Sequence, residues 1–142
     1  MKLVSHMLSV QTTGPGFTDI TGEVREWLTH QHTSEGQLTL FIRHTSASLL
    51  IQENADPDVL ADLQRFMERL APWDKTLYRH TTEGADDMPG HIRAALTQTS
   101  LTVPVLGGDL ALGAWQAIYL WEHRASPQRR DIVLQLLASN VR

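Results

Sequence analysis

The sequence predicts an α+β fold with mostly antiparallel strands, about six or seven in number, and about three helices. Strand-like segments dominate both ends of the chain, whereas helical patterns cluster in the middle. Short turns separate most of the strand candidates, and strands do not alternate regularly with helices. Such turns favour antiparallel pairing, because parallel strands need long crossover connections.

The first half of the chain begins with a strand candidate at residues 3–12, which Gly-Pro-Gly at 14–16 ends. Apolar residues at helical spacing then predict an amphipathic helix from residue 19 to residue 31. QLTLFIRH, residues 37–44, alternates between apolar and polar side chains, and SASLLI, residues 46–51, is a second apolar run. We expect both segments to form strands.

The second half begins with a helix that starts at Pro57, where Asp56 is a good N-cap and proline fits the first helical position. Its apolar stripe continues until Pro72. A short helix is expected at residues 88–97. Three strand candidates finish the chain: SLTVPVL, GAWQAIYLWE and DIVLQLLA.

Length and composition limit the classes of protein. A chain of 142 residues has the length of one ordinary domain, so residues 1–142 are expected to form a single domain. The chain has no cysteine, so a transition-metal site would have to use imidazole and carboxylate groups. A net charge of -4 argues against nonspecific binding of nucleic acid. It leaves room for a small anionic ligand held by local arginines.

The N-terminal segment has no long apolar run and no cleavage pattern of a signal peptide. No segment approaches the roughly 18 apolar residues that a membrane span needs. We therefore expect a soluble cytoplasmic protein without a membrane partner.

Among the seven histidines, His44 stands out by its position. It ends the apolar face of a predicted strand and is followed by TSAS, whose small hydroxyl side chains, Ser46 among them, could hydrogen-bond a ligand. Taken alone, His44 is better explained as a residue that caps the core and bonds a backbone carbonyl. His30 and His32 fit a solvated helix end, His6 fits a structural role, and His123 fits either.

The segment EGADDMPGH, residues 83–91, has a structural and a functional interpretation. Asp87 could cap the short helix while Glu83 and Asp86 lie near its positive end. His91 is less well explained, because the positive end of a helix favours neutral imidazole, the form that binds metal. His80 precedes it in the same polar loop, but spacing alone leaves a three-histidine metal site open.

Three further polar residues also allow either a structural or a functional interpretation. Gln116 and Glu122 bracket two apolar residues on one face of a predicted strand. They either mark strand ends that reach solvent or lie at the mouth of a pocket. Asn54, just before the second helix, could also reach a ligand.

Four segments of the chain resemble the YjbQ family, a small bacterial and archaeal family also called the secondary thiamine-phosphate synthase family. They are HTSASLLIQENADPDV, HTTEGADDMPGH, TSLTVPV and LGAWQAIYLWEHR, and they occur here in the family's order and spacing. The resemblance extends from about residue 5 to about residue 138.

This resemblance implies an α+β, mostly antiparallel β-sheet sandwich that assembles as a homotrimer. It also implies a polar pocket with a bound divalent metal, held by His44, His80 and His91. Three imidazoles suit zinc, although nickel, copper and iron also accept them.

Other positions are assigned to the same pocket by the resemblance and by their neighbourhood. As catalytic groups we predict Glu122, Asp87 and Gln116. As substrate-binding groups we predict Ser46, Asn54, Glu83, Asp86 and Arg43. Gly90 stands where a serine is often found in the family.

The family name implies that an aminopyrimidine diphosphate is joined to a thiazole phosphate. This chemistry needs neutralisation of the leaving diphosphate, to which Arg43, Arg79, Arg93 or Arg124 could contribute. The alternatives are a metal-assisted hydrolase, a non-catalytic protein that binds a metal or a phosphometabolite, and a purely structural trimer.

Overall fold

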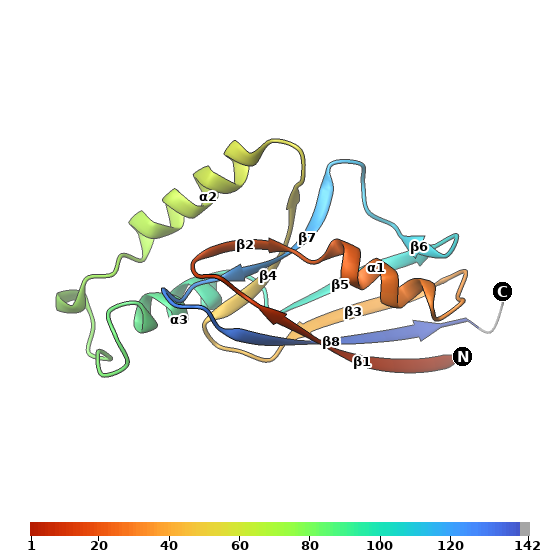
Figure 1. Ribbon diagram of the computed structural model, residues 1–142, viewed down its shortest axis with the longest axis horizontal. Coiled ribbons are helices and arrows are strands. Elements are labelled where there is room, and N and C mark those ends of the chain that lie inside the picture. The colour runs from red at the N-terminus through yellow and green to blue at the C-terminus, as the bar shows by residue number, and fades with distance from the viewer. Residues whose placement is uncertain (140–142) are drawn as a thin grey trace.

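The computed structural model describes residues 1–139 and has an α+β fold, as predicted. Its strands form a five-stranded sheet of order β1-β8-β3-β5-β6 and a three-stranded sheet of order β2-β7-β4 (Figure 1). Every pairing within the two sheets is antiparallel. The predicted antiparallel arrangement is therefore confirmed for the described residues.

The five-stranded sheet contains β1 (Lys2–Gln11), β8 (Arg129–Ala138), β3 (Gly36–Ile42), β5 (Ser100–Leu106) and β6 (Asp109–Leu110). The three-stranded sheet contains β2 (Gly16–Asp19), β7 (Gln116–Glu122) and β4 (Ala47–Glu53). The helices are α1 (Thr21–Thr29), α2 (Pro57–Leu70) and α3 (Asp87–Leu96), with one 3-10 turn at Lys75–Leu77. None of the helices within residues 1–139 has the length and apolar character needed to cross a membrane.

The hydrophobic core lies between the two sheets. Alternate residues of β3 and β8 point into it, and the same cluster takes in Leu49 of β4 and Leu120 of β7. Val24 and Leu28 add one face of α1. This core fixes which face of each strand is buried, and so which strand ends carry side chains to the rim.

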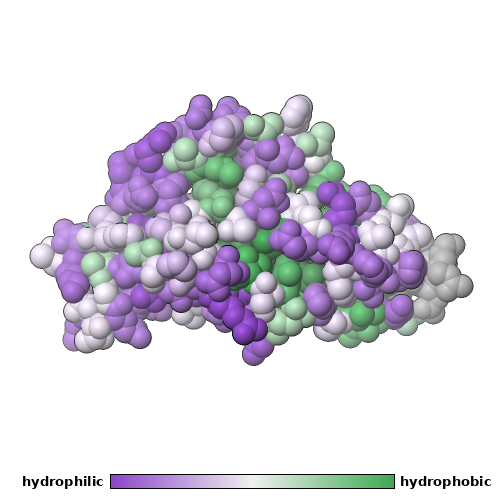
Figure 2. All heavy atoms as spheres, viewed as in Figure 1, coloured by the Kyte–Doolittle hydropathy of each residue, from purple (hydrophilic) through white to green (hydrophobic). Residues whose placement is uncertain are grey.

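Helix α2 lies on the outside of the molecule, and Met67 is its only buried residue (Figure 1). Hydrophilic side chains gather over it in Figure 2. Asp56 caps it as predicted, since its carboxylate accepts a hydrogen bond of 2.9 Å from the Asp58 amide. Local capping therefore defines the start of α2, although few of its side chains reach the core.

Helix α3 lies at the opposite end of the molecule from the N-terminus (Figure 1). Its N-cap is Asp86, without a side-chain capping bond, and Asp87 is its first helical residue. The structural interpretation of Asp87 as the cap is thus wrong by one position. Both carboxylates are turned toward other partners, which form the site described next.

Candidate functional site

Three polar side chains from the loop before α3 and from its first turns converge. Asp87 and His91 are four residues apart, which places them on one face of the helix. Asp87 Oδ2 lies 2.7 Å from His80 Nε2 and 3.1 Å from His91 Nε2. One ligand atom from each of the three residues lies within 4.8 Å of the others, which is compatible with a shared metal ion.

Asp87 is the centre of this cluster, and its side chain is nearly inaccessible to solvent. Burial by itself would raise the pKa of Asp87, but the hydrogen bond from His80 and the charge of Arg124 outweigh burial and lower it. Arg124 Nη1 holds Oδ1 at 2.8 Å, so Oδ2 is left for the two histidines. The carboxylate is therefore ionised and oriented before any metal arrives.

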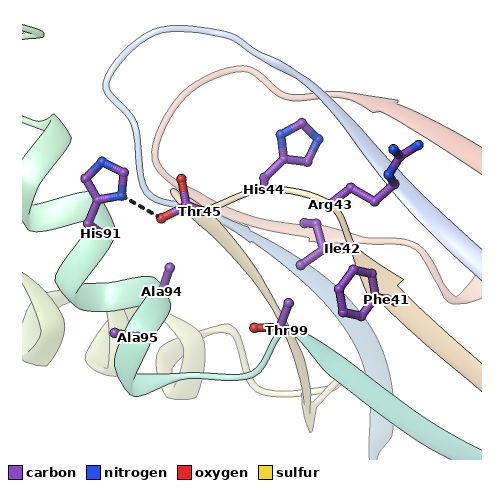
Figure 3. Close-up of a pocket in the computed structure, with 9 residues that line it drawn as sticks. All are labelled: Phe41, Ile42, Arg43, His44, Thr45, His91, Ala94, Ala95 and Thr99. Carbon is purple, nitrogen blue, oxygen red and sulfur yellow. Dashed lines mark hydrogen bonds between the residues drawn. The ribbon is translucent and has the colours of Figure 1, made fainter.

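His91 has its ring orientation set by the backbone. Its Nδ1 lies 3.0 Å from the carbonyl oxygen of Thr45, as the dashed line in Figure 3 marks. A carbonyl only accepts, so Nδ1 carries the hydrogen, and in the neutral ring Nε2 presents a lone pair to Asp87. Two lone pairs facing each other repel. The contact therefore calls for an additional proton on His91 or for a cation between the groups, which suits a metal site.

His80 completes the cluster from the loop. Its hydrogen bond to Asp87 raises the pKa of His80; burial, the next largest effect, opposes this, and the neighbouring Glu83 adds to the rise. Glu83 Oε2 lies 3.2 Å from His80 Nε2. A metal ion binding here would have to displace the proton that His80 shares with Asp87.

Arg124 and Asp86 fasten this loop to the segment after β7. Arg124 Nε donates to Asp86 Oδ2 at 2.8 Å, and its Nη2 donates to the Glu83 carbonyl at 3.1 Å. The Ala125 amide donates to the same Asp86 oxygen. Burial would raise the pKa of Asp86, but these hydrogen bonds lower it. Asp86 therefore acts as an anchor of the loop in this structure.

A cavity of about 470 Å³ adjoins the cluster and shares His91 with it. It is lined by Phe41, Ile42, Arg43, His44, Thr45, His91, Ala94, Ala95 and Thr99 (Figure 3). Figure 3 shows α3 on one side of this space and the end of β3 on the other. The walls are mostly apolar, so a ring could be held there beside the polar cluster.

His44 lines this cavity but stays outside the three-residue cluster. Its Nε2 accepts a hydrogen bond of 2.8 Å from the Asp131 amide, and its Nδ1 lies 3.4 Å from Arg130 Nη1. Burial, followed by the charge of Arg130, lowers the pKa of His44. His44 is thus a neutral histidine whose Nε2 lone pair is already used within the chain.

Glu122 and Ser46, two other predicted site residues, are engaged in the interior. Glu122 is 0% exposed and accepts hydrogen bonds of 2.8 Å from Arg130 Nε and from Thr12 Oγ1. Its other oxygen accepts from the amides of His123 and Arg124. Ser46 Oγ accepts from Arg130 at 3.0 Å. Neither side chain lines the cavity.

Asn54 and Gln116 lie at the other end of the β4–β7 pair from Glu122. They line a separate polar cavity of about 460 Å³. Asn54 Nδ2 donates to the Ala114 carbonyl at 3.1 Å, and Gln116 Oε1 accepts from the Gly113 amide at 2.8 Å. A single chain therefore does not bring these two residues to the histidine cluster.

Sequence reasoning missed the buried role of Arg130 and left His123 undecided. Side chains alternate between the two faces of β8, and Arg130 lies on the same inward face as Ile132. This alternation in the sequence could have predicted that Arg130 is buried. His123 is also buried, with Nε2 2.9 Å from Ser48 Oγ and no partner for Nδ1 among the described residues. Burial is the first cause that lowers the pKa of His123, to about 3, so it is neutral.

Comparisons with known proteins agree with this architecture. The family model described as UPF0047 protein YjbQ-like matches residues 6–139. The UPF0047 protein sll1880 of Synechocystis is 48% identical over 130 residues, which make up 92% of this chain and 88% of that protein. The UPF0047 protein YjbQ of Escherichia coli O157:H7 is 42% identical over 130 residues, 91% of this chain and 94% of that protein.

Solved structures show the same fold. The crystal structure of an uncharacterised YjbQ/UPF0047 protein from Clostridium acetobutylicum has a TM-score of 0.84 and 31% identity, covering 93% of this chain and 99% of that one. A conserved hypothetical protein from Thermus thermophilus has a TM-score of 0.82 and 36% identity, with the same coverage of 93% and 99%. With a family model that matches almost the whole described chain, and relatives this similar, the chain belongs to the YjbQ-like UPF0047 family.

Proposed function

We propose that this chain is a divalent-metal enzyme that acts on a small phosphorylated molecule, with His80, Asp87 and His91 as the metal ligands. The observation that carries the proposal is the approach of three ligand atoms to within 4.8 Å of one another beside a cavity. The contact of 3.1 Å between His91 Nε2 and Asp87 Oδ2, which a cation between the two groups would satisfy, adds to it. Two imidazoles and one carboxylate suit zinc with an open position, and they also suit non-haem iron.

We assign the following roles to the residues around the proposed metal site. Arg124 holds Asp87, and the Thr45 carbonyl holds His91, so that both ligands keep their orientation. The apolar wall of the cavity would exclude water from a bound ring, and Arg43 at its edge could pair with a phosphate. A bound divalent metal would supply charge neutralisation and Lewis acidity at this position.

The candidate reaction is the joining of an aminopyrimidine diphosphate to a thiazole phosphate to give thiamine phosphate. The family resemblance motivates it, and a mostly apolar cavity of about 470 Å³ that also includes the cationic Arg43 supports it. Metal-assisted hydrolysis of a phosphorylated metabolite is the enzymatic alternative within the same proposal.

A second candidate is a protein that binds a metal or a phosphometabolite without turnover. One observation favours it: the described lining of the cavity includes no carboxylate, and Glu122 is enclosed in the interior. Among the described lining residues, a general base could therefore come only from a histidine, His44 or His91, and a reaction that loses diphosphate needs a base less than hydrolysis does.

The experiment begins with elemental analysis of protein purified without a histidine tag, followed by zinc titration of wild type, His91→Ala and Asp87→Asn. His30→Ala is the matched control, because His30 is an exposed histidine on α1's C-terminal side. We expect one metal per chain in wild type and control, and loss of tight binding in both site variants. Retained binding in Asp87→Asn and His91→Ala would reject the cluster as a metal site.

Turnover is tested next with metal-loaded protein and the two thiamine precursors. Formation of thiamine phosphate by wild type and His30→Ala, but not by His91→Ala, supports the transferase. Metal binding without product, together with a raised melting temperature in the presence of phosphometabolites, would select the binding protein instead.

We further propose that the chain assembles as a homotrimer through the outer face of the five-stranded sheet. Strand register places Leu3, Met7, Phe41 and Leu137 on this one face, and all four are exposed in the single chain. Exposed apolar area of this kind is typical of a protein–protein interface. Light scattering is expected to give the mass of three chains for wild type and of one chain for Leu137→Glu, and a monomeric wild type would contradict the proposal.

A further inference from the structure

A second feature of α3, separate from the metal cluster, is a buried guanidinium. The side chain of Arg93 belongs to a residue that is only 1% exposed. Its Nε and Nη2 both donate to one acceptor, the Ala71 carbonyl at the end of α2, at 3.2 and 2.7 Å. Within residues 1–139, Nη1 makes no hydrogen bond and Arg93 takes part in no ion pair.

This arrangement leaves the charge of Arg93 without a direct counter-ion. A guanidinium carries five N–H donors and stays protonated in proteins, so one carbonyl oxygen satisfies only part of it. Burial lowers the pKa of Arg93, and Glu68 is the first of the more distant groups that oppose this effect. A buried charge is normally paired, so an anionic ligand is the kind of partner that would complement Arg93.

Arg93 lines a cavity of about 240 Å³, together with Glu68, Pro72 and Trp73. Trp73 is 46% exposed and lines this cavity, so it offers an accessible aromatic surface to a ligand. Pro72 adds a second apolar wall. The cavity thus combines a cationic donor, an aromatic surface and a single acidic group.

Arg93 is two residues beyond His91, and residues two apart on a helix do not face the same side. The cavity of Arg93 is accordingly lined by none of the residues of the metal cluster or of the cavity beside it. An anion bound at Arg93 would be a different ligand from the substrate of the proposed metal site.

We propose that this cavity binds a small monocarboxylate, with the carboxylate on Arg93 Nη1 and an apolar ring against Trp73. The volume admits a single ring. Glu68 at the same wall repels a doubly charged phosphate more strongly than a carboxylate, and a planar carboxylate matches the guanidinium fork.

Benzoate is the probe that tests the proposal, added to the 142-residue chain while the side-chain N–H signal of Trp73 is followed by NMR. We expect saturable shifts of this signal for wild type. Trp73→Ala should weaken binding about tenfold because the stacking surface is lost. Glu68→Gln should tighten it about threefold because a like charge is removed. Inorganic phosphate should bind more weakly than benzoate.

Arg65→Gln is the matched control, since Arg65 is an exposed arginine on α2 that pairs with Asp62. Arg93→Lys should lose benzoate binding if it folds; because Arg93 also holds Ala71, circular dichroism must accompany that measurement. Should Arg93→Lys unfold, Trp73→Ala and Glu68→Gln decide the matter. The site would be rejected if wild type showed no saturable shifts, or if wild type, Trp73→Ala and Glu68→Gln bound benzoate equally. Tighter binding of phosphate than of benzoate would reject a carboxylate as the preferred ligand.

Discussion

At the scale of single residues, Asp87 makes the contacts on which most of the candidate site depends. One oxygen is held by Arg124 and the other is shared by His80 and His91. A short polar side chain at the first position of a helix thereby joins a loop, a helix and the segment after β7. Its removal should change the pKa of His80 and weaken the proposed binding of a metal.

The first prediction concerns His80 in the metal-free protein. Its pKa is raised above 6.5 in the folded state, chiefly by the bond to Asp87. The stability that this pair contributes is therefore fully present below the unfolded pKa of 6.5 and is lost as pH rises through the raised folded value. In Asp87→Asn, NMR titration should show the pKa of His80 moving down toward 6.5. An unchanged titration of His80, with Asp62→Asn as control, would show that Asp87 is not its partner.

The second prediction is the pH dependence of metal affinity. Zinc must displace the proton of His80, so its affinity should rise with pH until the raised pKa of His80 is passed and then level off. Competition titrations with a chelator from about pH 5.5 to about pH 8.5 measure this curve. A flat curve would mean that His80 is not a ligand.

Individual residues also show which parts of the candidate site could be predicted from the sequence and which could not. The family resemblance named His80 and His91 as metal ligands and Asp87 as a catalytic group, whereas their spacing in one polar segment left a metal site open. The position of His44 depends on the Asp131 amide, 87 residues away in the chain, which no local pattern reveals. The resemblance placed Asn54 and Gln116 around the same pocket, but it carries no information on which end of a strand pair they occupy.

At the scale of elements, helices are specified more locally than short strands. Helix α2 was predicted from its cap and first-turn proline, and α3 from its apolar spacing. The strands β2 and β6 were not predicted: they have four and two residues, too few for a detectable alternation. β2 exists because β7 pairs with it, after Gly14 and Gly16 take positive φ angles of 131° and 124°.

The third prediction tests the cap of α2. Asp56→Ala removes the acceptor for the Asp58 amide and should lower the free energy of unfolding by about 1 kcal/mol. Urea unfolding measures the change. Asp62→Ala, an exposed change within the same helix, should stay within about 0.5 kcal/mol of wild type. Equal effects of the two changes would argue against a specific capping role.

At the scale of the whole molecule, Glu122 and Arg130 connect the two sheets. Glu122 ends β7 of the three-stranded sheet and Arg130 lies in β8 of the five-stranded sheet, and both are buried. Thr12, just after β1, donates to the same carboxylate. A single ionic network thus joins elements that are far apart in the sequence.

The fourth prediction separates this structural role from the catalytic role assigned to Glu122 from the sequence. Glu122→Gln leaves the Arg130 charge buried without its partner and should lower the free energy of unfolding by about 3–5 kcal/mol. Metal affinity of the folded protein should remain, because Glu122 does not touch the cluster. Glu26→Gln on the surface of α1 serves as control. Unchanged stability with loss of turnover would support the predicted catalytic role of Glu122 instead.

Helix α3 carries residues of both proposed sites, the metal cluster and the cavity of Arg93. His91 and Arg93 are carried by one rigid helix, two positions apart and directed to different sides. A shift of the helix that improves one contact must alter the other. If benzoate changes the affinity for zinc by some factor, thermodynamic reciprocity requires zinc to change the affinity for benzoate by the same factor, and α3 is the element that would couple the two proposed sites.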